Sequence, residues 1–286
     1  MKLARYRFED RIAIGIVEGD KVLDVSAAVP DAPASIEAML AAGPEELHRI
    51  ERLARAAARA RPLAAVRLEC PIPHPQKYLA IGMNYHDHAE EARKAGIPIP
   101  TTQLWFNKQV TCVTGPYDEV CKPKVSDRMD YEAELGVVIG KRCRYVPEGE
   151  ALSVVGGYFV ANDLTARDWQ QASPTFTLGK SFDTHGPIGP WIITADEIGD
   201  PQALELRCYV NGELRQQQST AKMIYSVAQQ IAHLSKVMTL MPGDLIATGT
   251  CSGIGAVLGK FLQPGDVVRV EVDRIGHIEN RVILEP

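Results

Sequence analysis

The chain has 286 residues, of which 45% are hydrophobic and 23% are charged, with 23 glycines and 19 prolines. This balance is typical of a globular, loop-rich protein and excludes a disordered or fibrous one. A net charge of -5 provides no general attraction to nucleic-acid phosphates or anionic membranes, so we exclude both as main partners.

The N-terminus is charged and alternating, without the apolar core of a signal peptide, and no apolar run approaches the length of a membrane span. The six cysteines form no Cys-x-x-Cys pair and show no zinc-ligand spacing. We therefore expect a cytoplasmic protein with reduced thiols.

The first part of the chain predicts a small α+β unit. A turn at residues 18–20 separates two runs of branched apolar residues, which indicates a β-hairpin. Ser35 can cap a short helix, and Gly43-Pro44 separates it from a second helix with apolar residues at helical spacing. Four arginines crowd the second helix and favour a solvated face over an anion site: Arg49, Arg52, Arg55 and Arg59.

The proline-rich segment 70–75 can neither continue a helix nor serve as a central strand. It reads as an extended linker. We place the domain boundary there, with a small N-terminal domain over residues 1–71 and a larger domain over residues 72–286.

The larger domain consists mostly of short apolar runs bounded by Gly, Pro, Asn or Asp, which predict strands. These runs are KYLAIG (77–82), QLWFNK (103–108), AELGVVIG (133–140), VVGGYFVAND (154–163), LELRCYVNG (204–212), DLIATGT (244–250) and DVVRVEV (266–272). Helices are predicted over residues 88–96 and 219–238. Strands outnumber helices and do not alternate with them, so we expect an α+β, mainly β fold instead of a doubly wound sheet.

Acidic and apolar residues alternate over residues 130–139, so a strand would place Glu132 and Glu134 on one face. Paired carboxylates raise each other's pKa unless a cation lies between them. Oxygen-only ligands suit Mg²⁺, Mn²⁺ or Ca²⁺ better than zinc. On this motif alone, a solvent-facing strand with surface glutamates is the favoured alternative.

A third carboxylate, Asp163, ends a predicted strand where the chain becomes polar, and strand ends are where binding sites are commonly built. Asp163 strengthens the hypothesis of a metal site at Glu132 and Glu134. Taken by itself, it could equally cap the following helix.

His88 and Glu91 stand three residues apart, a spacing that brings them together on a helix. Glu91 could then orient His88 as a base that takes a proton from water. A surface helix can acquire such a pair by chance, and His86 is a competing candidate without an obvious partner.

Lys180 follows a glycine and an apolar run, an unusual place for a purely solvating lysine, and it could bind a substrate carboxylate or enolate. The loop 247–255 is rich in glycine and hydroxyl groups and could cradle an anion, or could be a simple tight turn. It matches neither the dinucleotide fingerprint nor the P-loop, which excludes those nucleotide sites. Cys251 in this loop has no histidine partner motif, so a packed thiol is favoured over a nucleophile.

Taken in order, these motifs resemble those of the fumarylacetoacetate hydrolase family. The segments that carry the resemblance are NYHDHAEE, QLWFNK, DYEAELGVVIGK, GGYFVANDLTARDWQ, LGKSFDTHGPIGPW, VNGELRQ and GDLIATGTCSGIG. The match extends from about Lys77 to the C-terminus. It implies the family's mixed β-roll core, preceded by the small N-terminal domain of its longer bacterial members.

The resemblance also implies roles for individual residues. Glu132, Glu134 and Asp163 match the ligands of Mg²⁺ or Mn²⁺, with Ca²⁺ as a further option. His88 and Glu91 match the pair that activates water. The residues that match positions around the substrate's oxo acid and carboxylate are Arg167, Gln170, Lys180 and Thr250, and Lys108 occupies a commonly basic position. Cys251, where many members have proline, and residues 105–107 depart from the pattern and bear on substrate shape.

The resemblance implies a homodimer that hydrolyses a C–C bond of a 2,4-dioxo acid to pyruvate and a carboxylic acid. The segment between Glu91 and Thr102 contains Gly96 and regularly spaced prolines and could close as a lid. The family's other activities leave decarboxylation, isomerisation or hydration of a related oxo acid open. A non-catalytic protein that sequesters metal and oxo acid is the alternative from another class.

Overall fold

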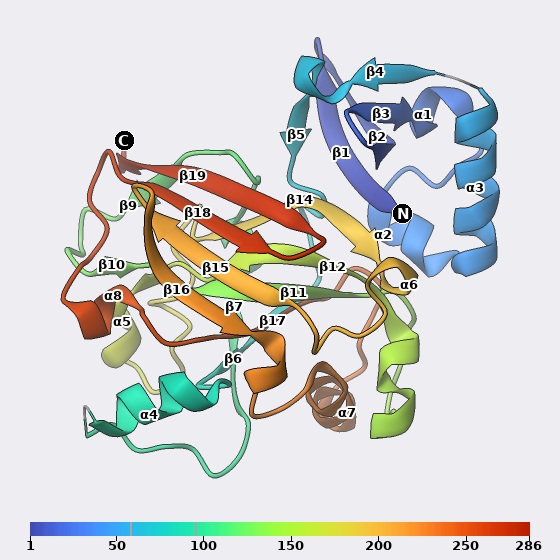
Figure 1. Ribbon diagram of the computed structural model, residues 1–286. Coiled ribbons are helices and arrows are strands. Elements are labelled where there is room, and N and C mark those ends of the chain that lie inside the picture. The colour runs from blue at the N-terminus through green and yellow to red at the C-terminus, as the bar shows by residue number, and fades with distance from the viewer. Residues whose placement is uncertain (58, 95) are drawn as a thin grey trace.

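The computed structural model describes residues 1–57, 59–94 and 96–286, and its strands form two large sheets and one small ribbon (Figure 1). The largest sheet runs in the order β4 (Ala60–Pro62), β3 (Lys21–Asp24), β2 (Arg11–Glu18), β1 (Lys2–Phe8), β14 (Gly186–Thr194), β12 (Val155–Asn162), β11 (Ala133–Ile139), β17 (Leu245–Thr250), β6 (Tyr78–Gly82) and β7 (Leu104–Lys108), with β5 (Arg67–Glu69) paired to β1 and β8 (Val113–Thr114) paired to β14. The second sheet runs β16 (Glu213–Ser219), β15 (Glu205–Val210), β18 (Val267–Val272), β19 (Gly276–Leu284) and β9 (Val120–Lys122), and the ribbon pairs β10 (Met129–Asp130) with β13 (Thr165–Ala166).

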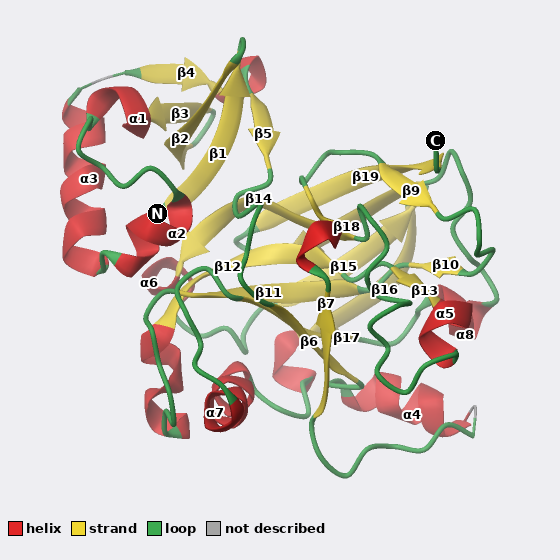
Figure 2. Ribbon diagram, turned by 180° about the vertical axis from the view of Figure 1, so that it is seen from behind, coloured by secondary structure: helices red, strands yellow, loops and turns green. Residues whose placement is uncertain are grey.

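The helices are short and lie around the sheets. They are α1 (Val25–Ala28), α2 (Ile36–Ala41), α3 (Pro44–Ala56), α4 (His86–Lys94), α5 (Arg167–Gln171), α6 (Ala195–Ile198), α7 (Val227–Val237) and α8 (Gly255–Leu258), with 3-10 turns η1 (Leu63–Ala65), η2 (Val110–Cys112), η3 (Glu148–Val154) and η4 (Thr220–Lys222). Helices α4, α5 and α8 gather at the end of the molecule away from α1, α2 and α3 (Figure 2). The prediction of an α+β, mainly β fold is confirmed.

Each apolar run predicted as a strand beyond residue 75 forms one, as β6, β7, β11, β12, β15, β17 and β18. The predicted helix over 219–238 is shorter than expected, because a capping box between Ser226 and Gln229 starts α7 only at Val227. The predicted helix over 88–96 is α4, which starts at His86; Ala95 lies outside the described residues.

The two faces of β11 belong to different cores. Leu135, Val137 and Ile139 lie in the core between the two large sheets, together with residues of β15 and β18. Val138 lies in the opposite core, with Phe159 of β12. Because side chains alternate along a strand, Glu134 shares the face of Val138 and leaves the other face wholly apolar.

Strand β14 was not among the predicted strands, because Pro187 and Pro190 interrupt its sequence and prolines are rare within sheets. The structure places β14 centrally, between β1 and β12. Its ladder with β12 shifts register between Tyr158 and Val160, so residues 190–192 fall outside the pairing with β12. This bulge accommodates the missing N–H of Pro190.

The N-terminal unit has the predicted elements and continues the largest sheet. The hairpin is β2–β3, and Ser35 caps α2 by accepting a hydrogen bond from the backbone of Ala38. Strand β1 pairs with β14, with Leu3 opposite Ile192, and both sides of residue 71 share one apolar core. The division into domains at that residue stays a prediction.

Three further sequence expectations concern charge, thiols and membranes. In α3, Arg49 pairs with Glu46 and Asp31, and Arg55 with Glu18 and Glu51, which confirms a solvated face. The cysteines are free thiols. No helix within residues 1–57, 59–94 and 96–286 has both the length and the apolar character needed to cross a lipid bilayer.

Candidate active site

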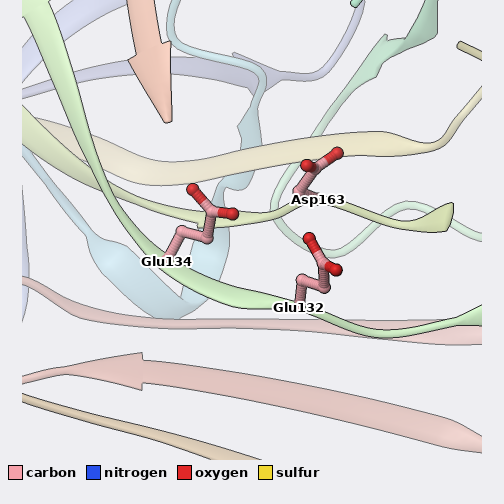
Figure 3. A group of neighbouring side chains, drawn as sticks. All are labelled: Glu132, Glu134 and Asp163. Atoms are coloured by element: carbon pink, nitrogen blue, oxygen red, sulfur yellow. The ribbon is translucent and has the colours of Figure 1, made fainter. Parts of the chain in front are cut away.

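Three buried carboxylates converge at the end of β11 (Figure 3). Glu132 directly precedes β11 and Glu134 lies within it, while Asp163 follows the neighbouring strand β12. A hydrogen bond of 2.9 Å from the amide of Asp163 to the carbonyl of Glu132 fixes this junction. One oxygen from each carboxylate lies within 4.8 Å of the others. The predicted convergence of these residues is therefore observed in the geometry.

Two lysines neutralise part of this negative charge. The Nζ of Lys180 lies 2.6 Å from Oε2 of Glu132 and 2.7 Å from Oδ2 of Asp163. The Nζ of Lys108 lies 2.6 Å from the other oxygen of Asp163, and it also donates to the carbonyls of Leu164 and Lys180. Asp163 is thus held by an ammonium group on each oxygen.

An arginine completes the positive side of the cluster. The Nε of Arg167 donates to Oδ2 of Asp130 at 2.7 Å, and its Nη2 lies 2.7 Å from Oε1 of Glu132. Burial by itself raises the pKa of Glu132, but Lys180 and Arg167 outweigh burial and lower that pKa to about 2. Glu132 is therefore a carboxylate at neutral pH.

Glu134 has no such cation among the described residues. Its Oε2 accepts a 2.7 Å hydrogen bond from the amide of Gly249, which adopts a φ of 98° that a side chain would strain. Burial, and then the charges of Asp163 and Glu132, raise the pKa of Glu134 well above its ordinary value. Counted together with Asp130, four carboxylates lie beside the three cations Lys108, Lys180 and Arg167, and Glu134 is the carboxylate that no lysine or arginine of the described residues contacts. Hard oxygen donors with uncompensated charge fit a divalent cation such as Mg²⁺ or Mn²⁺.

Helix α4 places a histidine beside the cluster. The Nδ1 of His88 lies 3.5 Å from Oε2 of Glu91, whose carboxylate also accepts from the amide of Gly253. The carboxylate of Asp87 accepts hydrogen bonds from Ser252 and Gln218, which ties the start of α4 to the loop after β17. His88 is therefore held with Nε2 as the ring nitrogen left for a ligand.

A cavity of about 490 Å³ opens between α4, α5 and α8. Its polar lining includes His88, Glu132 and Lys180, so the histidine faces the same space as one carboxylate of the cluster and the lysine bound to it. The rest of the wall is largely apolar and includes Phe106, Phe176, Leu104, Ile254 and Val257. The arrangement suits a ligand with a polar, anionic head and a longer apolar or extended body.

The family model for the C-terminal part of fumarylacetoacetate (FAA) hydrolase matches residues 77–283. The chain belongs to the fumarylacetoacetate hydrolase family. This confirms the family that the motifs indicated.

Relatives within the family carry different activities in their names. Oxaloacetate tautomerase of Xenopus laevis is 38% identical, covering 99% of this chain and 90% of the relative. Maleylpyruvate hydrolase from Sphingobium sp. SYK-6, solved in complex with manganese (II) ion and pyruvate, is 34% identical with a TM-score of 0.82, covering both chains fully. The 5-carboxymethyl-2-hydroxymuconate delta-isomerase from Mycobacterium smegmatis is 32% identical with a TM-score of 0.79, again over both full chains. Family membership thus shows an enzyme fold without selecting one reaction.

The residues carried over from the family do not all reach the cavity. Arg167, Gln170 and Thr250 line it together with Glu132 and Lys180. The side-chain oxygen of Gln170 accepts from Arg167 at 3.1 Å, which leaves its Nε2 as a donor. The hydroxyl of Thr250 already donates to Ala133 and accepts from Gln216.

Lys108 is placed differently from the expected substrate contact. Its side chain is fully buried, and it does not belong to the cavity wall. Its ammonium group is directed at Asp163, so its role in this geometry is to hold that carboxylate. The competing candidate His86 is exposed, and the thiol of Cys251 is buried with its pKa raised by burial, so a packed thiol is confirmed.

Two features of this site were not singled out from the sequence. Asp130 pairs with Arg167 and accepts from the amides of Gly255 and Ala256, which fixes the start of α8. Asp130 is the first residue of the D-Y-E-A-E motif, and this position could have indicated that it belongs to the site. Phe176 lines the cavity with a φ of 61°, rare for a bulky residue, and only the folded chain shows this.

Proposed function

We propose that this protein is a divalent-metal-dependent hydrolase that cleaves a C–C bond of a 2,4-dioxo acid, giving pyruvate and a carboxylic acid. The observation that carries this proposal is the shared cavity, in which His88, oriented by Glu91, faces the same space as Glu132 and Lys180. A base for water and a cationic group for a developing enolate are both needed for this cleavage.

Glu132, Glu134 and Asp163 would hold Mg²⁺ or Mn²⁺. When bound, the cation supplies Lewis-acid polarisation of the oxo acid. The manganese and pyruvate in the Sphingobium maleylpyruvate hydrolase structure support this assignment. The N–H donors of Gln170 and Arg167 at the cavity wall are suited to the substrate carboxylate.

His88 takes a proton from water through Nε2, while Glu91 stabilises the resulting imidazolium at Nδ1. The hydroxide adds to the distal carbonyl of the substrate, and the bond between that carbon and the pyruvate methylene breaks. The electron pair of that bond passes to the pyruvate fragment as an enolate, whose charge the Lys180 ammonium stabilises. The imidazolium of His88 returns its proton to the enolate carbon, so that one water is consumed and the base is restored.

A second candidate, keto–enol tautomerisation of oxaloacetate, is favoured by the 38% identity with the Xenopus laevis tautomerase. That reaction moves a proton between carbon and oxygen and consumes no water. The cavity of about 490 Å³ and its apolar wall favour the larger acylpyruvates over the small, doubly charged oxaloacetate.

The test is a comparison of products in the presence of Mg²⁺ or Mn²⁺. Acetylpyruvate and longer acylpyruvates are assayed for pyruvate release, and oxaloacetate is assayed for enol–keto exchange and for CO₂. Hydrolysis predicts metal-dependent pyruvate release that Glu132→Gln abolishes. If no acylpyruvate releases pyruvate while oxaloacetate exchange is accelerated, the protein is a tautomerase; accelerated CO₂ release would instead identify a decarboxylase.

A further inference from the structure

One cation of the cavity wall takes no part in the carboxylate cluster. Arg128 lines the same cavity as Lys180 and Arg167 and is partly buried. Arg167 is bound by Asp130 and Glu132, whereas the guanidinium of Arg128 has neither an ion-pair partner nor a hydrogen-bond acceptor within the described part of the chain. A guanidinium in a cavity without a protein carboxylate is available to a ligand anion.

The surroundings of Arg128 restrain its position before any ligand binds. Its amide donates to the hydroxyl of Ser126 at 3.1 Å, and its carbonyl accepts from the amide of Arg167 at the start of α5. The guanidinium stacks over the ring of Phe261, 5.2 Å from the ring centroid. Stacking leaves the N–H edge of an arginine open for bidentate contact with a carboxylate.

The hydrogen bond to Arg167 joins Arg128 to the start of α5, and α5 and α8 are neighbours at one end of the molecule (Figures 1 and 2). The next residue, Met129, accepts a hydrogen bond from Leu262, so this part of the chain is joined to the segment that follows α8. The apolar residues Ile254 and Val257 belong to the same wall. The cavity wall therefore offers an extended ligand apolar contacts and, besides Lys180 and Arg167, a further positive charge at Arg128.

We propose that Arg128 is a specificity-determining residue that binds a second carboxylate, at the far end of the acyl group. The preferred substrates are then acylpyruvates whose acyl chain ends in a carboxylate. This inference rests on the proposed function for the identity of the substrate head. Arg128 then determines which acyl groups bind and takes no part in the cleavage of the C–C bond.

The experiment compares two substrates that differ only at the tail. Succinylpyruvate ends in a carboxylate, and in 4-methylpentanoylpyruvate an isopropyl group replaces it. Both are assayed with the wild-type protein, Arg128→Gln, Arg128→Lys and the control Arg142→Gln, which changes an exposed arginine away from the cavity. Losing one charged contact raises KM for succinylpyruvate by about tenfold in Arg128→Gln, with kcat and the neutral substrate changed by less than about twofold. Arg128→Lys restores part of the selectivity.

An equal loss for both substrates overturns the inference, because it shows a structural role for Arg128. An unchanged ratio between the substrates overturns it as well, because it shows that the stack on Phe261 is all that Arg128 contributes.

A binding measurement separates this inference from the proposed function. With Mn²⁺ present, calorimetry compares 2-oxoadipate with 6-methyl-2-oxoheptanoate, neither of which has the 2,4-dioxo unit to be cleaved. Preference for 2-oxoadipate that Arg128→Gln removes supports the inference even if no acylpyruvate is hydrolysed. Pyruvate release from acylpyruvates without any Arg128-dependent preference in either measurement upholds the function and overturns the inference.

Discussion

Lys108 and Lys180 bind different oxygens of the Asp163 carboxylate, with Nζ–O distances of 2.6 and 2.7 Å. Only Lys180 lines the cavity. The two lysines therefore have different tasks: Lys108 holds Asp163 in place from inside the protein, and Lys180 faces both the cluster and the substrate. Substituting Lys108 should therefore mainly change the stability of the fold, and substituting Lys180 should mainly change the rate of the reaction.

We expect Lys108→Met to lower the free energy of unfolding by about 3 kcal/mol, because it leaves one oxygen of the buried Asp163 carboxylate without its ammonium partner. Lys180→Met is expected to lower kcat by about 10²-fold or more, because a charge that stabilises the enolate is lost. Urea unfolding and steady-state kinetics with saturating Mn²⁺ measure both effects, with Lys141→Met, an exposed lysine, as control. The division of roles is wrong if Lys108→Met reduces kcat as strongly as Lys180→Met without a loss of stability.

Glu134 is the carboxylate whose charge the lysines and arginine leave uncompensated, so it is expected to contribute strongly to cation binding. Glu134→Gln keeps the shape and removes the charge. We expect Mn²⁺ affinity, measured by calorimetry, to fall by about 100-fold or more, since such ions require charged oxygen ligands. The metal-free variant should unfold at no lower temperature than the wild type, because a buried repulsion is relieved. Glu148→Gln, at an exposed glutamate, is the control, and unchanged Mn²⁺ binding in Glu134→Gln would contradict the assignment.

The pair His88–Glu91 predicts a graded loss of hydrolysis. Removing the base in His88→Gln should lower kcat by about 10²–10⁴-fold. The variant should still bind Mn²⁺ and oxalate, a small dicarboxylate that resembles the oxo-acid head of the substrate. Glu91→Gln should cost less, because the imidazole remains and loses only its charged partner. His86→Gln changes an exposed histidine on the same helix and serves as the matched control. Full activity in His88→Gln would require a reaction that needs no water base, such as decarboxylation.

His185 predicts a pH dependence of stability that is independent of turnover. Burial, and then the charge of Lys108, lower the pKa of this histidine to about 3; Lys180 acts in the same direction, and the carbonyl of Cys121 opposes it as the ring's hydrogen-bond partner. Because the folded pKa lies below the unfolded value, the unfolded chain binds the extra proton. The stability contributed by neutral His185 is complete above the ordinary histidine pKa of about 6.5 and is lost as pH falls from there towards 3.

The slope from this one group is at most about 1.4 kcal/mol per pH unit. Urea unfolding is measured between pH 7.5 and 5, a range that includes the ordinary histidine pKa and lies above the pKa of most carboxylates. The free energy of unfolding should fall with this slope in the wild type and with a smaller slope in His185→Gln. An identical slope in both proteins would assign the effect to other groups.

Local sequence predicted the β2–β3 hairpin, seven further strands, the helix of His88 and the common face of Glu132 and Glu134, because these follow from periodicity and from neighbours a few residues apart. The capping of α2 by Ser35 was predictable for the same reason. Strand β14 was missed because its prolines argue against a strand locally, and only its two partner strands and the bulge beside Pro190 stabilise it.

The tertiary structure decided which charges meet. Lys108 and Asp163 are 55 residues apart, and no spacing rule joins them or turns the lysine away from the cavity. Likewise, Glu134 lacks a cationic partner and Arg128 lacks an acidic one because of which distant segments folding places beside them. Local pattern thus supplied the chemical groups, whereas long-range packing and burial assigned each group its partner, because electrostatic energies depend on distance in space and on desolvation instead of order along the chain.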